Sequence, residues 1–227
     1  MSKMFVSWSG GKESCLACYK AIQDGFVISH LLNFVDENGE RSRSHGIRTE
    51  LLRAQSDAIG IPIVQRCTTW KRYEVEFKKA ISELKQVGVE GGVFGDIDLQ
   101  EHRDWVERVC IEAGIKFILP LWLMKREKLL DEFTGAGFEA IIVAIKANVL
   151  GEGWLGCKVD RKFMRNLSRH KNIDLCGEAG EYHTLIIDGP IFKKRINILE
   201  SAKTLRNGRW ILDITSYELV EKRSEHD

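Results

Sequence analysis

The sequence predicts an α/β protein whose first part contains a parallel β-sheet. From residue 1 to about residue 120, short apolar runs alternate with segments whose apolar residues recur at helical spacing. Parallel strands need crossover connections, and a helix between two strands packs back onto the sheet as a right-handed unit. After Pro120 this alternation stops, and a glycine-rich stretch and a long hairpin pattern follow. We therefore expect two domains, a parallel-sheet domain at residues 1–120 and a smaller α/β domain at residues 121–227.

Strands and helices of the first part follow from apolar spacing and stop signals. Five apolar runs are expected to be buried strands: Phe5–Trp8, Val27–Phe34, Ile63–Val64, Gly92–Phe94 and Lys116–Leu119. Four stretches between them are expected to be helices: Glu13–Gln23, Arg48–Ala58, Tyr73–Val87 and Glu101–Ala113. Ligands of such sheets bind beyond the carboxyl ends of the strands. The segments that follow the first and fourth strands are therefore candidates for a binding site.

For the second part of the chain, the sequence predicts fewer helices and strands than for the first. They are a helix at Lys125–Phe133, a strand at Glu139–Ile145, a helix at Arg161–Arg169 and a hairpin of Arg195–Arg206 with Arg209–Val220. Asn207 and Gly208 join the two hairpin strands, and Asn-Gly between alternating runs is the strongest short hairpin signal.

Composition limits the class of partner. The chain has 227 residues and a formal net charge of +1, which argues against a broad positively charged surface that binds nucleic acid. The N-terminal apolar run is interrupted too early for a signal peptide, and no run approaches the ~18 apolar residues of a membrane span. Six scattered cysteines are most simply reduced thiols. We expect a cytoplasmic protein with no membrane partner.

The most informative segment lies between the first expected strand and the first expected helix. It combines two serines, two glycines, a lysine and a glutamate: Ser9, Gly10, Gly11, Lys12, Glu13 and Ser14. Glycines let backbone N–H groups approach an anion closely, and the N-terminus of the helix favours negative charge. The segment therefore predicts a phosphate-binding loop. A tight turn without a ligand is the simpler alternative.

Two aspartates follow the fourth expected strand. Asp96 could hold Mg²⁺ or a ribose hydroxyl, because magnesium that bridges phosphates prefers hard oxygen ligands. Asp98 is placed to cap the next helix, and such a cap is the structural alternative for this turn. His102 and Arg103 could reach a phosphate or lie on the helix surface.

A third segment, residues 177–184, concentrates carboxylates beside small residues. Glu178 and Glu181 flank Ala179 and Gly180, and a tyrosine, a histidine and a threonine follow. Such acids can bind an ammonium group or act as a general base. A polar turn that enters a strand is the alternative.

Three further residue types admit two interpretations. Cys15 and Cys18 lie one helical turn apart, where redox chemistry is conceivable and an apolar core face is favoured. His45 lies in a polar loop that could fold over an adenine or face solvent. Trp154 lies between glycines and could form a lid or a pocket wall.

The loop at residues 9–14 resembles the Ser-Gly-Gly-x-Asp-Ser loop of the N-type ATP pyrophosphatases, with Glu13 in place of the aspartate. It is not a Walker A loop, because Val6 stands where that motif needs a glycine. Trp154-Leu155-Gly156 and a Glu-x-Gly-Glu-Tyr segment follow the aspartate turn in order. With these motifs the chain resembles the diphthine–ammonia ligase family over nearly its whole length.

The resemblance implies a parallel-sheet, Rossmann-like ATP pyrophosphatase domain of the HUP type, followed by a smaller α/β domain. It also implies that ATP and ammonia amidate the carboxylate of diphthine on elongation factor 2 through an acyl-adenylate, with release of AMP and pyrophosphate. Taking the residues and the resemblance together, we expect nucleotide binding by Ser9, Gly10, Gly11, Lys12, Glu13, Ser14, His45, Gly95 and Asp96, with Mg²⁺ on Asp96. We expect Glu178 and Glu181 to be catalytic, and Trp154, Tyr182 and His183 to bind the substrate.

Two departures from the family pattern leave other functions open. His183 replaces a carboxylate of the family motif, and Ser44-His45-Gly46-Ile47 replaces a Met-Tyr-x-Thr type segment. The alternatives are a related adenylating enzyme that acts on another small acid, for example in cobamide metabolism, or on a tRNA base. A module that binds adenine nucleotides without turnover is a further alternative. A homodimer is compatible with the sequence.

Overall fold

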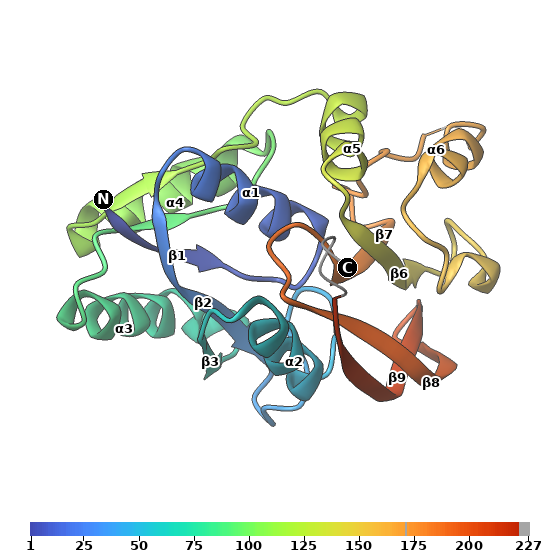
Figure 1. Ribbon diagram of the computed structural model, residues 1–227, viewed down its shortest axis with the longest axis horizontal. Coiled ribbons are helices and arrows are strands. Elements are labelled where there is room, and N and C mark those ends of the chain that lie inside the picture. The colour runs from blue at the N-terminus through green and yellow to red at the C-terminus, as the bar shows by residue number, and fades with distance from the viewer. Residues whose placement is uncertain (171, 223–227) are drawn as a thin grey trace. The chain divides into compact units, whose positions relative to one another are not determined.

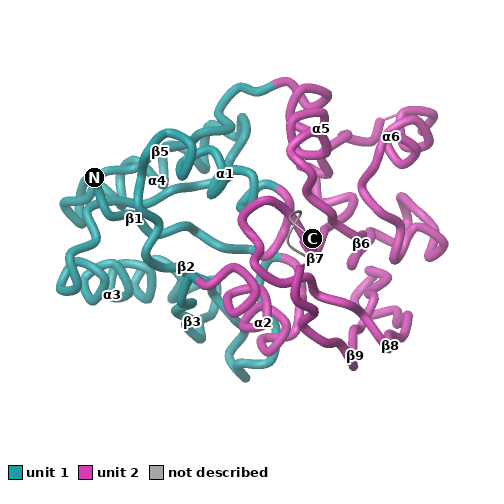
Figure 2. The backbone as a smooth tube through the Cα atoms, in the orientation of Figure 1, with its two compact units in different colours: residues 1–9, 13–44, 61–124 teal, residues 10–12, 45–60, 125–227 magenta. Residues whose placement is uncertain are grey.

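The computed structural model describes residues 1–170 and 172–222, which group into two compact units (Figure 2). The first unit contains residues 1–9, 13–44 and 61–124. Of the described residues, the second contains 10–12, 45–60, 125–170 and 172–222. Two short early segments of the chain thus group with the second unit. The expected domain boundary at residue 120 stays a prediction.

The first unit is built on a five-stranded parallel sheet, which confirms the predicted fold class (Figure 1). Its order is β3-β2-β1-β4-β5. The strands are β1 (Lys3–Ser7), β2 (Val27–Val35), β3 (Ile63–Cys67), β4 (Gly91–Val93) and β5 (Lys116–Ile118). The chain moves from β1 to one edge and then returns to add β4 and β5 on the other side. This reversal is a topological switch point, where open α/β sheets bind ligands.

Helices α1 (Lys12–Gln23), α3 (Tyr73–Gln86) and α4 (Gln100–Ala113) accompany this sheet, with a short 3₁₀ turn η1 (Trp70–Arg72). Residues of α3 and α4 pack with strand residues in one apolar cluster. Phe5 of β1 lies edge-on to Phe77 and Phe94, with ring centroids 6.2 and 5.9 Å apart. Met4 and Val6 point to the opposite face and are also buried. Both faces of the central strand are therefore covered, which explains why β1 reads as a continuous apolar run.

The second unit contains an antiparallel sheet of order β7-β6-β9-β8. The strands are β6 (Glu139–Lys146), β7 (Tyr182–Asp188), β8 (Lys194–Arg206) and β9 (Arg209–Glu221). Its helical segments are α2 (Thr49–Ile59), α5 (Arg126–Gly135), η2 (Glu152–Trp154) and α6 (Arg161–Leu167). Asn207 and Gly208 both have positive φ, at 50° and 73°. These angles suit the two-residue hairpin turn that the Asn-Gly pair predicts, and the hairpin is confirmed.

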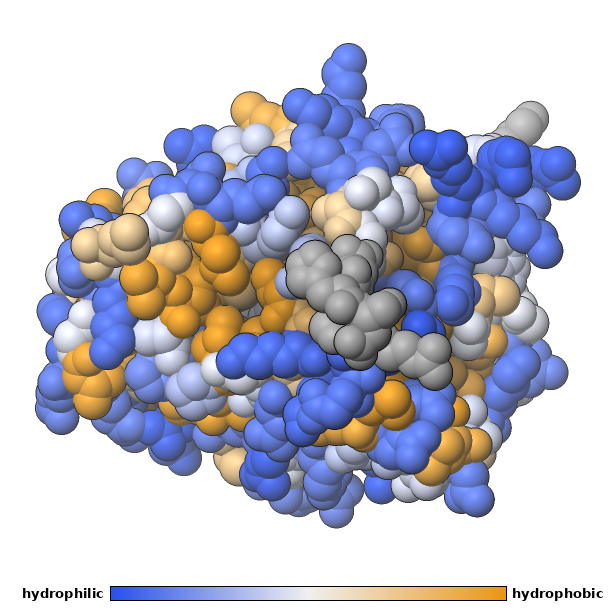
Figure 3. Space-filling view, viewed as in Figure 1, coloured by the Kyte–Doolittle hydropathy of each residue, from blue (hydrophilic) through white to orange (hydrophobic). Residues whose placement is uncertain are grey.

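Hydrophilic residues cover much of the visible surface, with smaller apolar patches among them (Figure 3). Within residues 1–170 and 172–222, no helix combines the length and the apolar character that a membrane span requires.

Candidate functional site

The ends of the predicted phosphate loop lie in the first unit. Ser9 and Ser14 have their Oγ atoms 3.1 Å apart, and the backbone N–H of Ser9 points to the Ser14 Oγ at 3.4 Å. Gly95 packs tightly against the start of α1, because an added Cβ would lie 2.9 Å from the carbonyl carbon of Glu13 and 3.0 Å from the nitrogen of Ser14. The fourth strand therefore ends directly against the loop. These contacts bring Ser9, Glu13, Ser14 and Gly95 close together, and their role in nucleotide binding stays a prediction.

The middle of the loop, Gly10–Lys12, packs within the second unit. Gly10 has φ +82°, a left-handed angle that glycine adopts without strain. Its carbonyl accepts hydrogen bonds from the Gln55 side chain at 3.0 Å and from the backbone N–H of Ile186 at 3.0 Å. Gln55 also donates to the carbonyl of Ile186 at 2.8 Å. Sequence reasoning missed Gln55, although a glutamine on the apolar face of α2 was a signal that a buried polar partner was required.

Lys12 is only 2% exposed. Its Nζ donates to the carbonyl of Cys176 at 2.5 Å and lies 4.7 Å from the centre of the Tyr182 ring. Its backbone N–H donates to Thr184 Oγ1 at 3.1 Å. The sequence suggested that Lys12 provides a positive charge in the loop. The structure adds that the ammonium of Lys12 already contacts the carbonyl of Cys176 and the ring of Tyr182.

His45 and His183 stack in the second unit, with ring centroids 4.6 Å apart and an interplanar angle of 26°. The Nδ1 atom of His45 lies 3.0 Å from the carbonyl oxygen of Thr184. A carbonyl can only accept, so this nitrogen carries the proton. His45 also lies against Gly11, where an added Cβ would be 2.3 Å from its Cε1 atom. His45 and His183 thus come together, and His45 fills the space that the missing side chain of Gly11 leaves.

The environment of His183 opposes its protonation. Burial and the nearby His45, Arg209 and Lys12 hold the pKa of His183 well below the usual value for histidine. An unfolded chain regains the ordinary pKa of about 6.5, so it binds the proton more readily than the folded chain. The low pKa of His183 therefore contributes fully to the stability of the folded protein above about pH 6.5, and this contribution is lost as the pH falls below that value.

We therefore expect His183→Gln to reduce the acid sensitivity of the protein. The melting temperature of the wild type should fall more steeply between about pH 7.5 and about pH 5.5 than that of the variant. Thermal unfolding in matched buffers measures this difference. Parallel pH profiles for the two proteins would contradict it.

Asp96 lies in the first unit, in a cavity of about 360 Å³. Ser7, Arg43, Trp70, Tyr73, Phe94, His102 and Trp105 are among the lining residues. The Nδ1 atom of His102 lies 3.1 Å from the carboxylate of Asp96. Burial, the largest of several effects, raises the pKa of Tyr73 to about 12, so this phenol stays protonated. The cavity has aromatic walls and one carboxylate, which suits a nucleoside more than a bare anion.

Asp98 is not the N-cap residue of the next helix. Helix α4 begins at Gln100, and Leu99 occupies its N-cap position. Sequence reasoning also missed Arg43, whose guanidinium lies 4.5 Å over the ring of Trp70 and donates to the carbonyl of Thr68 at 2.7 Å.

The carboxylate segment in the second unit is partly a loop and partly strand β7, which begins at Tyr182. Glu181 is 5% exposed, and its Oε1 atom accepts a hydrogen bond from the backbone N–H of Asp174 at 2.9 Å. Glu178 is half-buried on the same loop. The carboxylate of Asp174 accepts bonds from Arg126 Nε at 2.9 Å and from the backbone N–H of Cys176 at 2.7 Å. Neither Asp174 nor Arg126 stood out in the sequence, because they lie 48 residues apart.

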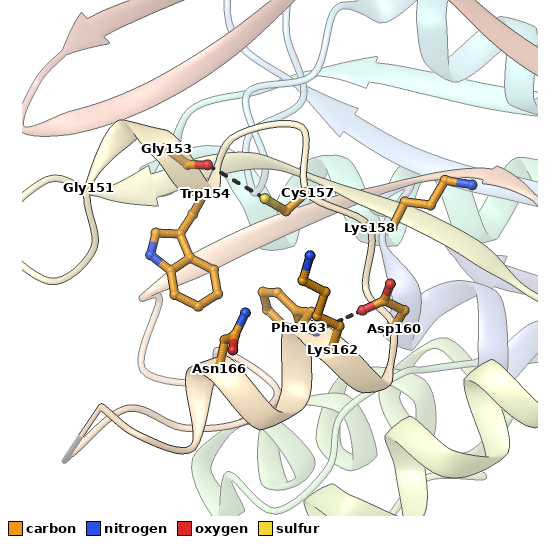
Figure 4. Close-up of a pocket in the computed structure, with 9 residues that line it drawn as sticks. All are labelled: Gly151, Gly153, Trp154, Cys157, Lys158, Asp160, Lys162, Phe163 and Asn166. Carbon is orange, nitrogen blue, oxygen red and sulfur yellow. Dashed lines mark hydrogen bonds between the residues drawn. The ribbon is translucent and has the colours of Figure 1, made fainter.

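Trp154 lines a separate cavity of the second unit, of about 600 Å³ (Figure 4). The ring of Trp154 lies edge-on to Phe163 at 5.6 Å, and Phe163 lies edge-on to Tyr182 at 5.4 Å. Figure 4 shows Trp154 and Asn166 facing the same space, with the ammonium of Lys162 extending toward it. Trp154 therefore forms a pocket wall, and its substrate role stays a prediction.

Cys15 and Cys18 are buried free thiols, which confirms the core interpretation. Burial raises the pKa of Cys18 to about 12 and that of Cys15 well above its usual value. A thiolate is the reactive form of cysteine, so these two residues are not a reactive pair.

Comparison with known proteins identifies two matching family models. The diphthamide synthase N-terminal domain matches residues 2–117, and the diphthamide synthase C-terminal domain matches residues 125–220.

Curated relatives agree with the family models. A mouse diphthine–ammonia ligase is 27% identical over 230 residues, which cover 87% of this chain and 82% of that protein. The human protein of the same name is 27% identical, with the same coverage. The Schizosaccharomyces pombe diphthine–ammonia ligase is also 27% identical over 83% of this chain, but this chain spans only 34% of that protein. A crystal structure described as a predicted subunit of tRNA methyltransferase from Methanocaldococcus jannaschii aligns with 84% of this chain and 98% of that chain, at a TM-score of 0.47 and 15% identity.

Proposed function

Because the chain belongs to the diphthamide synthase family, we propose that it is an ATP-dependent ligase that joins ammonia to a carboxylate. The proposed acceptor is the carboxylate of diphthine, the substrate for which the mouse and human relatives are named. The family resemblance suggests that this diphthine belongs to elongation factor 2. The products are the amide, AMP and pyrophosphate.

The observation that carries this proposal is the junction of β1 and α1. The serine hydroxyls of the loop lie 3.1 Å apart at the carboxyl end of a central parallel strand. Gly95, at the end of the neighbouring strand, is packed against Glu13 and Ser14 so closely that a larger residue would collide with backbone atoms. A strand, a glycine-containing loop and a helix N-terminus at a topological switch point form a phosphate-binding arrangement.

The proposed reaction has two steps. A carboxylate oxygen of the substrate attacks the α-phosphorus of ATP, the bond between the α and β phosphates breaks, and pyrophosphate leaves. Ammonia then attacks the carbonyl carbon of the acyl-adenylate, the bond to AMP breaks, and a base takes a proton from the nitrogen. Ser9, Gly10, Gly11 and Ser14 would hold the phosphates, and Lys12 would join them by giving up its bond to the carbonyl of Cys176. Glu178 or Glu181 would serve as the base. Positioning and charge stabilisation would supply most of the rate enhancement.

The residues of the first unit fit a magnesium ion that the nucleotide brings with it. Asp96 offers one carboxylate, and no cluster of three or more His, Cys, Asp or Glu side chains suited to a metal occurs in the described part of the chain. Magnesium commonly uses one or two carboxylates and completes its coordination with phosphate oxygens and water. Asp96 would hold the ion, which would neutralise phosphate charge.

The cavity beside Trp154 is the proposed binding place for the side chain of the acyl substrate. The indole offers a face for a planar ring, and the edge of Phe163 supports it at 5.6 Å. Lys162 and Asn166 line the same cavity with a positive charge and an amide. A planar ring with polar substituents suits these walls, to which Lys158 and Asp160 also contribute a positive and a negative charge.

Product analysis tests the reaction class. We expect ATP, ammonia and diphthine-containing elongation factor 2 to give AMP and pyrophosphate in equal amounts with the amide, measured by chromatography and mass spectrometry. Production of ADP and phosphate alone would rule out the proposed reaction. AMP formation only with another small acid would favour the second candidate, an adenylating enzyme with a different acceptor. The histidine at position 183, which stacks on His45, supports that candidate, because the family motif has a carboxylate at this position.

A further inference from the structure

We propose that the Oε2 atom of Glu181 binds ammonium and accepts one of its protons, which leaves ammonia as the nucleophile, and that Asp174 is the positioning residue for this carboxylate. This inference rests on the proposed function and selects one of the two glutamates left open there.

Glu181 presents one oxygen that lacks a partner. Its main chain is fixed to β6, because its carbonyl accepts a hydrogen bond from the backbone N–H of Lys146 at 2.8 Å. Its Oε1 atom is occupied by the backbone N–H of Asp174 at 2.9 Å. Its Oε2 atom is buried and has no hydrogen-bond partner among residues 1–170 and 172–222. A buried carboxylate oxygen without a donor is unfavourable, so the arrangement calls for a ligand that donates hydrogen bonds.

Asp174 decides which oxygen of Glu181 stays open. Its Oδ2 atom accepts from Arg126 Nε at 2.9 Å, and Arg126 is the first residue of α5. Its Oδ1 atom accepts from the backbone N–H of Cys176 at 2.7 Å and, at 3.4 Å, from that of Glu178. Both oxygens of Asp174 are therefore engaged, which fixes the loop from residue 174 to residue 178. The fixed loop directs the backbone N–H of Asp174 to the Oε1 atom of Glu181 and leaves the Oε2 atom without a donor.

Size and charge identify the ligand. Because Oε2 of Glu181 is buried, only a group about as large as a water molecule can lie beside it without a major rearrangement. Ammonium is of that size, carries the charge opposite to a carboxylate, and donates hydrogen bonds in every direction. Among the proposed reactants, ATP and the carboxylate acceptor are both anionic and far larger. Glu178 is less suited, because its side chain is only half-buried and has no buried oxygen without a hydrogen-bond partner.

The first test measures ammonium binding without turnover. Thermal unfolding is followed with increasing ammonium chloride or with tetramethylammonium chloride at the same ionic strength. We expect ammonium to raise the melting temperature saturably, by about 3 °C when it exceeds its dissociation constant tenfold. Tetramethylammonium is too large and should give no such rise. Glu181→Gln should abolish the ammonium effect, and the matched variant Glu178→Gln should keep it.

An equal rise with both cations, or a rise that persists in Glu181→Gln, would overturn the proposal. This measurement needs no acyl substrate, so it can fail or succeed independently of the ligase assignment. Circular dichroism checks that each variant is folded before its titration is interpreted.

The second test addresses Asp174. Asp174→Asn keeps an oxygen for the N–H of Cys176 but weakens the pair with Arg126. We expect the KM for ammonia to rise about tenfold with little change in the KM for ATP. A variant that raises both constants equally, or neither, would show that Asp174 is structural only. In the thermal assay the same variant should need a correspondingly higher ammonium concentration for half of the effect.

Discussion

Glu181→Gln should reduce turnover with the true acid substrate about a hundredfold while ATP affinity stays the same. Glutamine keeps the size of the side chain and can still accept the N–H of Asp174, but it has no charge and cannot take a proton. A positioned base that is removed in this way typically costs a factor of that order. Steady-state kinetics of pyrophosphate release, combined with calorimetric titration of ATP, separates turnover from nucleotide binding.

A matched control is Glu200→Gln, which removes an exposed carboxylate on β8 of the same unit and should leave both quantities unchanged. If Glu181→Gln turns over normally, the segment is a structural turn and Glu181 has no catalytic role. If the variant instead loses ATP affinity, its carboxylate belongs to nucleotide binding.

Gly11→Val should weaken ATP binding at least tenfold, which corresponds to about 1.4 kcal/mol. An added Cβ at residue 11 would lie 2.3 Å from Cε1 of His45 and 3.2 Å from Oγ1 of Thr184. The valine must therefore displace the ring of His45, which would lose its bond to the carbonyl of Thr184. Because His45 already occupies that side of Gly11, the valine acts on ATP binding by displacing His45, which is itself a proposed nucleotide-binding residue. Isothermal titration with ATP measures the change.

Gly153→Val is the control, because no heavy atom lies within 4 Å of an added Cβ at that position. It should keep the wild-type affinity for ATP. Unchanged affinity in Gly11→Val, with the control behaving as expected, would remove the phosphate-loop interpretation.

Local patterns in the sequence predicted the secondary structure well. Apolar spacing and glycine stops were enough to predict the alternation of β1, α1 and β2. Strands that are buried on both faces are uniformly apolar, so they stand out in the sequence. The hairpin of β8 and β9 followed from Asn207 and Gly208, because only a few residues tolerate positive φ in a two-residue turn. The motif order in turn predicted the family to which both domain models now assign the chain.

The partners of the site residues could not be predicted in the same way. Lys12 meets the carbonyl of Cys176, which lies 164 residues away, and His45 meets the carbonyl of Thr184, 139 residues away. Asp174 and Arg126 could not be paired from the sequence, since no motif contains both of them. Such contacts depend on which strands pair and where a loop ends in space, and no local spacing rule contains this information.

The sequence by itself therefore determined the elements and the fold class, because these depend on backbone propensity and on short-range apolar period. It also determined the family, because the order of the motifs is a property of the sequence. The tertiary structure alone decided that Lys12 is buried against Tyr182, that His183 stacks on His45, and that one oxygen of Glu181 stays open. The physical reason is the cost of burying polar groups. Each buried charge or hydrogen-bonding group must find a partner wherever the fold brings one within about 3 Å, however distant that partner is along the chain.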